Sequence, residues 1–150
     1  MPIVTSLEAL EILDSRGRPT VAVTCQFDDR ISATVQVPSG ASTGRAEAHE
    51  LRDGDPRRHA GLGCRKAVAS VLGEIQGAIA GQEWDDQARL DRALIDLDGT
   101  PSKCRLGANA ILGVSLAFAR ACARPHAIPA AERAESTRAL SRRIDTLKVP

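Results

Sequence analysis

Residues 37–44, of sequence Val-Pro-Ser-Gly-Ala-Ser-Thr-Gly, bring hydroxyl side chains and two glycines together in one short loop. Neutral hydroxyl oxygens can bind a hard cation or contact a phosphate group without adding charge to the site. Glycine permits positive φ angles, so a loop of this kind can bend and close. The composition therefore indicates a lid over a ligand. It leaves open a solvated turn, which is what most Ser/Gly-rich segments form.

Two alternating runs lead into this loop. In residues 21–27, and again in residues 31–37, apolar and polar side chains alternate, which is typical of strands with one buried face. Residues 3–13 have a weaker β-like pattern, and residues 14–19 contain enough turn formers to reverse the chain. The sequence therefore predicts a three-stranded antiparallel meander that ends at the loop.

The spacing of apolar residues becomes helical after the loop. A first helix is predicted over residues 68–79, and a second one is predicted to begin after Asp85 or Asp86 and to end near residue 98. Residues 106–123 are almost entirely small or aliphatic, so a third helix is expected to lie sandwiched between partners, with Asn109 bonded to backbone groups near its start. The first helix is expected to bury Val68, Val71, Leu72, Ile75 and Ile79, with Gly81 as its C-terminal cap.

These elements predict one α+β domain over residues 1–123, in which a three-stranded antiparallel meander is followed by a helical bundle. The net charge of +1 and the scarcity of aromatic residues give no basis for nucleic-acid or membrane binding. The four cysteines lack metal-binding spacing, and we expect them to be reduced and buried. Because the first residues show no signal-peptide pattern, a cytoplasmic location is expected.

Residues 124–150 differ from the rest of the chain. They carry six basic residues against three acidic ones, with prolines at positions 125, 129 and 150. Leu140, Ile144 and Leu147 are spaced as an apolar stripe on a short basic helix. The segment is interpreted as a divergent basic tail that is either loosely helical or disordered. A surface-binding role for the tail is a weaker alternative, because charges of this kind usually only face solvent.

Several motifs, taken in order, resemble the N-terminal domain of enolase, the phosphopyruvate hydratase of glycolysis. The resemblance covers roughly residues 3–123, and the order and spacing of the motifs make it specific. The motifs are Ile-Leu-Asp-Ser-Arg-Gly at 12–17, Pro-Ser-Gly-Ala-Ser-Thr-Gly at 38–44, Glu-Leu-Arg-Asp-Gly-Asp at 50–55, Leu-Asp-Gly-Thr at 97–100 and Leu-Gly-Ala-Asn-Ala-Ile-Leu-Gly-Val-Ser at 106–115.

The resemblance implies a substrate lid formed by Ser39, Gly40, Ala41, Ser42, Thr43 and Gly44. It also implies that Ser42 is a ligand of the second magnesium ion, together with oxygens of the substrate. One lid hydroxyl suits Mg²⁺, which is commonly held by one or two protein groups plus substrate phosphate. Structural roles are expected for the charged residues Arg16, Glu47, Glu50, Arg52, Asp53 and Asp55.

The activity implied is a Mg²⁺-dependent lyase reaction that converts 2-phosphoglycerate to phosphoenolpyruvate. In the family the base lysine and the carboxylates of the first magnesium site come from a C-terminal barrel. A (β/α)₈ barrel needs about 200 to 250 residues, so these 150 residues are expected to lack it. We therefore expect no catalytic residue in this chain and no activity without a barrel supplied in trans.

Two of the positions that depart from the family pattern bear on its homodimer. Leu10 and Ala22 stand where an arginine and a glutamate usually form salt bridges across a homodimer, which makes that dimer doubtful here. The family pattern is also lost after Ala123, as premature termination, a frameshift or a genuinely split enzyme would each produce. The alternative function is a non-catalytic interaction module that retains the fold.

Overall fold

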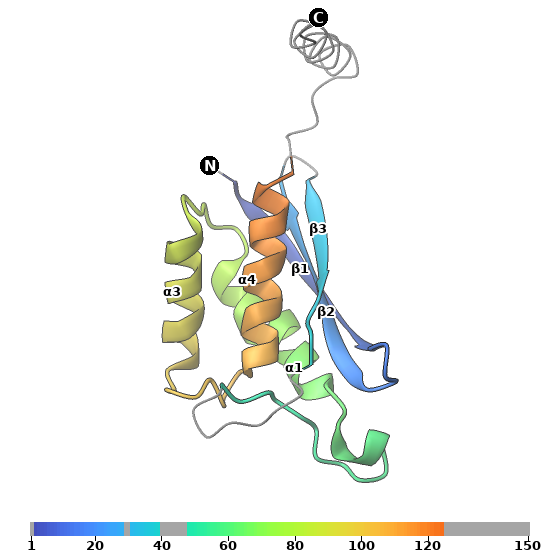
Figure 1. Ribbon diagram of the computed structural model, residues 1–150. Helices are drawn as coiled ribbons and strands as arrows, with labels where there is room; N and C mark the ends of the chain where they lie inside the picture. The colour runs from blue at the N-terminus through green and yellow to red at the C-terminus, as the bar shows by residue number, and fades with distance from the viewer. Residues whose placement is uncertain (1, 29–30, 40–47, 125–150) are drawn as a thin grey trace, which may run out of the picture.

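The computed structural model describes residues 2–28, 31–39 and 48–124, and it consists of a sheet with helices on one of its faces (Figure 1). The sheet is antiparallel and contains three strands in the order β1-β2-β3. The strands are β1 (Val4–Leu13), β2 (Pro19–Phe27) and β3 (Ser32–Gln36). The predicted α+β class, with a meander preceding the helices, is confirmed.

The alternation of β2 decides which side chains reach the core. Val21, Val23 and Cys25 are fully buried beneath the helices. Because successive side chains of a strand point to opposite faces, Ala22 and Thr24 lie on the outer face of the sheet. There the Thr24 hydroxyl is 2.8 Å from the Thr34 hydroxyl of β3.

The first helical region is less regular than predicted. It runs through α1 (Arg65–Ser70), a π-helical turn η2 (Val71–Ile75) and α2 (Gln76–Ile79), and it follows a short 3-10 turn, η1 (His59–Gly61). In a π-helical turn the rotation per residue about the helix axis is smaller than in an α-helix. The side chains in and after η2 therefore point in other directions than a regular α-helix would give them. Val71, Ile75 and Ile79 are buried, whereas Leu72 is 45% exposed. The predicted burial of Leu72 is therefore wrong.

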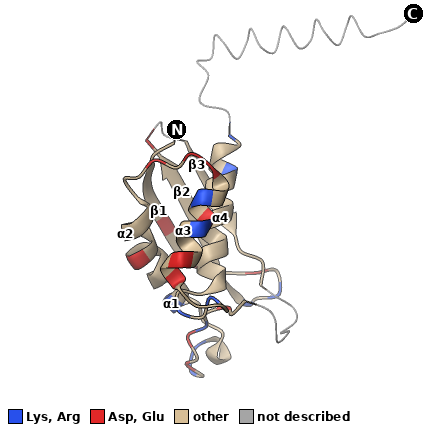
Figure 2. Cartoon of the chain, turned by 90° about the vertical axis from the view of Figure 1, so that its left-hand side faces the viewer, with Lys and Arg blue, Asp and Glu red and all other residues tan. Residues whose placement is uncertain are grey.

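The second helix agrees closely with its prediction. Helix α3 spans Gln87–Asp98 and buries Leu90 and Leu94. Its N-cap is Asp86, whose Oδ1 accepts a 2.7 Å hydrogen bond from the Arg89 amide. Asp85 instead pairs with the Arg89 guanidinium at 3.1 Å. Acidic and basic residues lie side by side along this helix (Figure 2).

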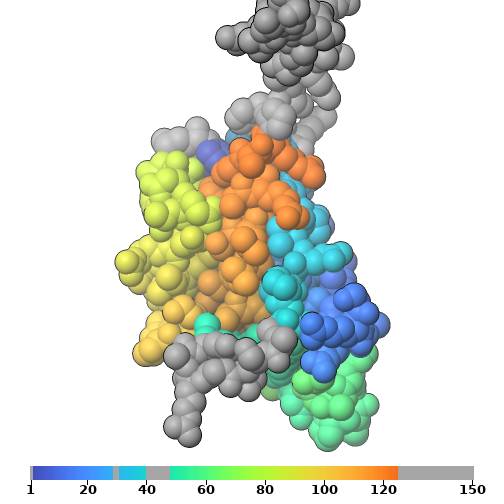
Figure 3. Space-filling model, in the orientation of Figure 1, coloured from blue at the N-terminus to red at the C-terminus, as the bar shows by residue number. Residues whose placement is uncertain are grey.

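Helix α4 (Ala108–Cys122) packs against β2 and β3 on one side and against α3 on another (Figure 1). Gly113 makes the approach to the sheet possible, because a Cβ at this position would lie 2.6 Å from Val23 Cγ2. One strip of α4 nevertheless remains open between α3 and β3 (Figure 3). Leu112 is 42% exposed and Leu116 is 39% exposed, so the expectation that α4 would be sandwiched between partners is only partly correct.

The cysteines also differ from the prediction. All four are free, but only Cys25 and Cys64 are buried, while Cys104 and Cys122 are exposed. Burial raises the pKa of the Cys25 thiol to about 12. Sequence spacing does not reveal that Cys104 lies in the loop between α3 and α4 and that Cys122 is the last residue of α4. Within the described residues, no helix is both long and apolar enough to cross a bilayer.

Candidate functional site

The start of the predicted lid loop is bound to the turn between β1 and β2. The Ser39 hydroxyl donates a 3.0 Å hydrogen bond to Asp14 Oδ2. The other oxygen of this carboxylate accepts bonds from the Arg16 and Arg18 amides, at 2.8 and 2.9 Å. The bond from the Arg18 amide, aided by those from Arg16 and Ser39, holds the pKa of Asp14 below its usual value. A negative charge at Asp14 thus organises the turn and the loop start together.

A second pair of bonds fixes the loop start to β2. The Val37 amide donates to the Val21 carbonyl at 2.9 Å. The buried Thr20 hydroxyl donates to the Val37 carbonyl at 2.6 Å. Because these bonds lie beyond the last residue of β3, the chain is held against the sheet as far as Ser39.

The far end of the loop is bound to the beginning of α4. The Asn109 side chain clamps the backbone of Leu51, accepting from its amide and donating to its carbonyl, both at 3.1 Å. The His49 amide donates to Ser102 at 2.7 Å, and the His49 carbonyl accepts from Ala108 at 2.8 Å. The prediction that Asn109 bonds backbone groups near the helix start is confirmed. The bond near the helix start is the one that the Ala110 amide donates to Asn109 Oδ1 at 3.2 Å, whereas the bonds to Leu51, 58 positions away, were not predicted.

Most of the predicted site residues lie outside the described residues. Of the six lid positions, only Ser39 is described; Gly40, Ala41, Ser42, Thr43 and Gly44 are not, and neither is Glu47. The proposed metal-binding role of Ser42 therefore stays a prediction. Across residues 2–28, 31–39 and 48–124, no group of three or more His, Cys, Asp or Glu side chains could hold a metal ion.

The charged residues after the loop form structural anchors. The Arg52 guanidinium donates to the carbonyls of Pro19 and Leu62, at 2.6 and 2.8 Å, and pairs with Glu50 at 2.6 Å. Asp53 accepts bonds from the first amides of α1, those of Arg65 and Lys66, at 3.1 and 2.9 Å. The segment that leaves the loop is thereby bound to β2 on one side and to α1 on the other, as the structural interpretation of these residues predicted.

A further ion pair was not foreseen in the sequence. The Glu11 carboxylate on β1 forms two hydrogen bonds with the guanidinium of Arg58 and accepts another from the Cys64 amide. Arg58 also lies 3.5 Å from Asp53. No local pattern could have identified this pair, because its members are 47 positions apart. The cluster connects the C-terminal end of the edge strand β1 to the turn before α1.

Comparison with known proteins identifies the family. Residues 4–132 match the family described as the N-terminal domain of enolase. The chain belongs to the enolase N-terminal domain family. It is 61% identical over 123 residues to the protein named Enolase from Mycobacteroides abscessus. That alignment covers 82% of this chain and 28% of the relative, so the chain spans less than a third of the length of that enolase.

The two departures that bear on the homodimer fall at one place in the sheet. Leu10 and Ala22 are direct cross-strand partners in the β1–β2 register. Leu10 is 67% exposed on the outer face, which the helices do not cover. In this enolase domain the apolar pair Leu10 and Ala22 therefore stands where the resemblance implies charged contacts between subunits.

We expect the Glu11 cluster to make the stability of this enolase domain depend on pH. The hydrogen bonds from Arg58, opposed by burial and aided by the Cys64 amide, lower the pKa of Glu11 to about 2 from its ordinary 4.5. A folded-state pKa below the unfolded value stabilises the fold above pH 4.5, and this contribution is lost as the pH falls toward 2. Glu11→Gln should therefore lower the free energy of unfolding at neutral pH by about 2 kcal/mol.

Urea unfolding of both proteins, followed by circular dichroism between neutral and acidic pH, measures this effect. The difference between wild type and Glu11→Gln should shrink as the solution becomes acidic. Glu8→Gln, on the exposed face of the same strand, is the matched control and should change little. A difference for Glu11→Gln that stays constant from neutral to acidic pH would show that the charge of Glu11 is not responsible.

Proposed function

We propose that this chain acts as the N-terminal, lid-bearing domain of a phosphopyruvate hydratase, the cytoplasmic Mg²⁺-dependent lyase of glycolysis that converts 2-phosphoglycerate to phosphoenolpyruvate. The observation that carries the proposal is the 61% identity to an enolase over nearly the whole described domain. The anchoring of both ends of the predicted lid loop supports it, because a loop that is to act on a substrate needs fixed ends.

The chain's own contribution would be limited to orientation and to one coordinating oxygen. Ser42 would supply a neutral hydroxyl to Mg²⁺, which when bound offsets the negative charge that develops on the substrate during proton abstraction. One hydroxyl is far from the near-octahedral set of oxygens that Mg²⁺ prefers. The remaining ligands and the base would come from a barrel, either in a longer form of this protein or as a separate chain.

Reconstitution tests this function directly. The chain is mixed with a polypeptide corresponding to the remainder of the Mycobacteroides abscessus enolase, and formation of phosphoenolpyruvate from 2-phosphoglycerate is followed with Mg²⁺ present. We expect activity in the mixture and none in either part alone. Ser42→Ala should lower this activity at least ~10-fold, as loss of a metal-site group commonly does.

Ser70→Ala provides the control for this experiment, because among the described residues the Ser70 hydroxyl bonds only the Lys66 carbonyl of its own helix. It should retain the activity of the wild-type mixture. Turnover by the purified chain alone would contradict the proposed division of labour. A mixture that forms a stable complex on a sizing column but has no activity would favour the interaction module instead.

A further inference from the structure

Strand β3 is an edge of the sheet, because the strands are ordered β1-β2-β3. Just beyond its end, the Val37 amide bonds the Val21 carbonyl, so this pair is hydrogen-bonded. Hydrogen-bonded and non-hydrogen-bonded pairs alternate along an antiparallel ladder, so the backbone groups of every second residue before Val37 point away from β2. These residues are Ser32, Thr34 and Gln36. The outer side of β3 therefore presents donors and acceptors that another strand could bond.

The sequence of β3, Ser-Ala-Thr-Val-Gln, contains neither the charged residues nor the prolines that usually keep an edge strand from pairing with another chain. Its register with β2 is continuous from Ser32 to Gln36. The opposite edge differs, because the β1–β2 register is irregular between Val4 and Ser6. On the outer side of β1, the Gln76 side chain also accepts a 2.9 Å bond from a backbone amide, that of Leu7. Protection of β3 therefore has to come from a neighbouring element.

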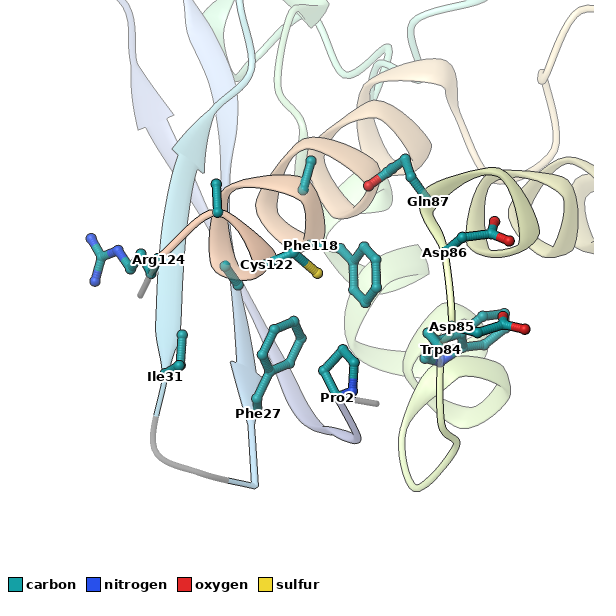
Figure 4. A pocket seen from close by; sticks show the side chains of 13 residues that line it. Pro2, Phe27, Ile31, Trp84, Asp85, Asp86, Gln87, Phe118, Cys122 and Arg124 are labelled. Atoms are coloured by element: carbon teal, nitrogen blue, oxygen red, sulfur yellow. The ribbon is translucent and has the colours of Figure 1, made fainter. Parts of the chain in front are cut away.

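Helix α4 supplies one charged side chain to this edge. Arg120 Nη1 donates a 3.1 Å hydrogen bond to the Thr34 carbonyl, and β3 lies at the surface beside α4 (Figure 3). Two contacts fix the helix at the distance from which this side chain reaches the strand. Gly113 lets the backbone approach the sheet, and the Phe118 ring meets the Phe27 ring edge to face, with centroids 5.6 Å apart (Figure 4). A positive charge therefore occupies the central acceptor of the edge.

A second copy of the chain is the partner that this edge fits. In an antiparallel pairing of two β3 strands centred on Thr34, Ser32 of each copy lies opposite Gln36 of the other, and the outward N–H and C=O groups match. The side chains that meet are neutral, so nothing on the strands themselves opposes the pairing. Arg120 opposes it in two ways. Each guanidinium occupies a Thr34 carbonyl, and the two like charges would lie close together at the two-fold axis.

We propose that Arg120 guards the β3 edge, and that without it two copies of the chain pair through β3 into one continuous sheet. Arg120 acts through its charge and its hydrogen bond and not through packing, since its side chain is exposed. The proposal does not rest on the proposed activity, because it concerns the sheet edge and none of the residues 39–44.

Sedimentation velocity over a series of protein concentrations measures the self-association. Arg120→Ala should associate at least ~10-fold more tightly than the wild-type protein, because each copy frees one acceptor and the repulsion between like charges is removed. Arg92→Ala removes the same charge from an exposed position on α3, and this matched control should behave as the wild-type protein does. Circular dichroism verifies that each variant is folded.

Hydrogen exchange followed by NMR identifies the surface that associates. In Arg120→Ala, at a concentration at which it associates, the three outward amides of β3 should exchange at least ~10-fold more slowly than in the wild-type protein. The amides of Ala33 and Val35 face β2 and should change little. Thr34→Pro in the Arg120→Ala background removes the central outward donor without breaking a bond to β2. It should return the association to the wild-type level.

Two results of the sedimentation experiment would overturn the proposal. One is association of Arg120→Ala no tighter than that of the wild-type protein, and the other is an equal gain in Arg92→Ala, which would show that net charge alone is responsible. The proposal is also wrong if Arg120→Ala associates while its outward β3 amides stay unprotected, or if Thr34→Pro leaves the association unchanged. Either finding would place the contact elsewhere on the molecule.

Discussion

Asp98→Ala should lower the free energy of unfolding by about 3 kcal/mol, since each buried group left without its partner costs about 1 to 3 kcal/mol. Asp98 is only 2% exposed. Its carboxylate accepts bonds from the Leu106 amide at 2.7 Å, the Thr100 amide at 3.0 Å and the Thr100 hydroxyl. Burial alone raises the pKa of Asp98, but these bonds outweigh it and the pKa is lowered. The side chain therefore holds the loop between α3 and α4 as an ionised acceptor.

Urea unfolding at neutral pH measures this loss, with Asp96→Ala as the control. Asp96 lies two residues before Asp98 on the same helix, but it is exposed. Its substitution should therefore change the free energy of unfolding by no more than about 0.5 kcal/mol. A loss below 1 kcal/mol for Asp98→Ala would contradict the assignment of three stabilising bonds. The substitution should also loosen the end of the lid loop, because Ser102, in the same connection, accepts the bond from the His49 amide.

Gly107→Ala should destabilise the domain by a similar amount, about 3 kcal/mol, from two separate causes. Gly107 has a φ of +97°, which is unfavourable for a residue with a Cβ atom. That atom would also lie 2.5 Å from Leu51 Cβ and 2.7 Å from Asn109 Oδ1. The substitution thus forces apart the clamp that holds the chain after the lid loop.

Gly99→Ala separates the two causes. Gly99 has a φ of +70°, but the nearest atom to a Cβ there is the Asp96 carbonyl oxygen at 3.7 Å. Only the backbone strain remains in Gly99→Ala, so we expect the free energy of unfolding to fall by about 1 kcal/mol. Amide chemical shifts of Leu51 should move in Gly107→Ala and not in Gly99→Ala. Equal losses of stability for both variants would show that the close approach to Leu51 is not energetically important.

The regular elements were predictable because their signals are local. Alternation through Val21, Val23 and Cys25 identified β2 and its buried face, and an aspartate ahead of the spaced Leu90 and Leu94 identified α3. Both patterns follow from the repeat of one element and need no knowledge of its neighbours.

What could not be predicted depends on contacts between distant residues or on small changes of helical turn. The η2 turn moves Leu72 to the surface, yet apolar spacing alone does not distinguish a π-turn from a regular helix. The pairing of Glu11 with Arg58 joins segments that have no common pattern. For the lid loop, the motif pointed to residues 39–44, but the anchors Asp14 and Asn109 emerged as its supports only when the strands and α4 were assembled.

The glycine at position 113 has a consequence for redesign of this domain. At Gly113 the backbone of α4 packs directly on the sheet, with no side chain between them. The distance between helix and sheet there therefore cannot be adjusted by a change of rotamer at position 113. A Cβ at 113 would approach Val23 to 2.6 Å and Val37 to 3.1 Å. Any larger residue there would have to be matched by trimming those two valines together.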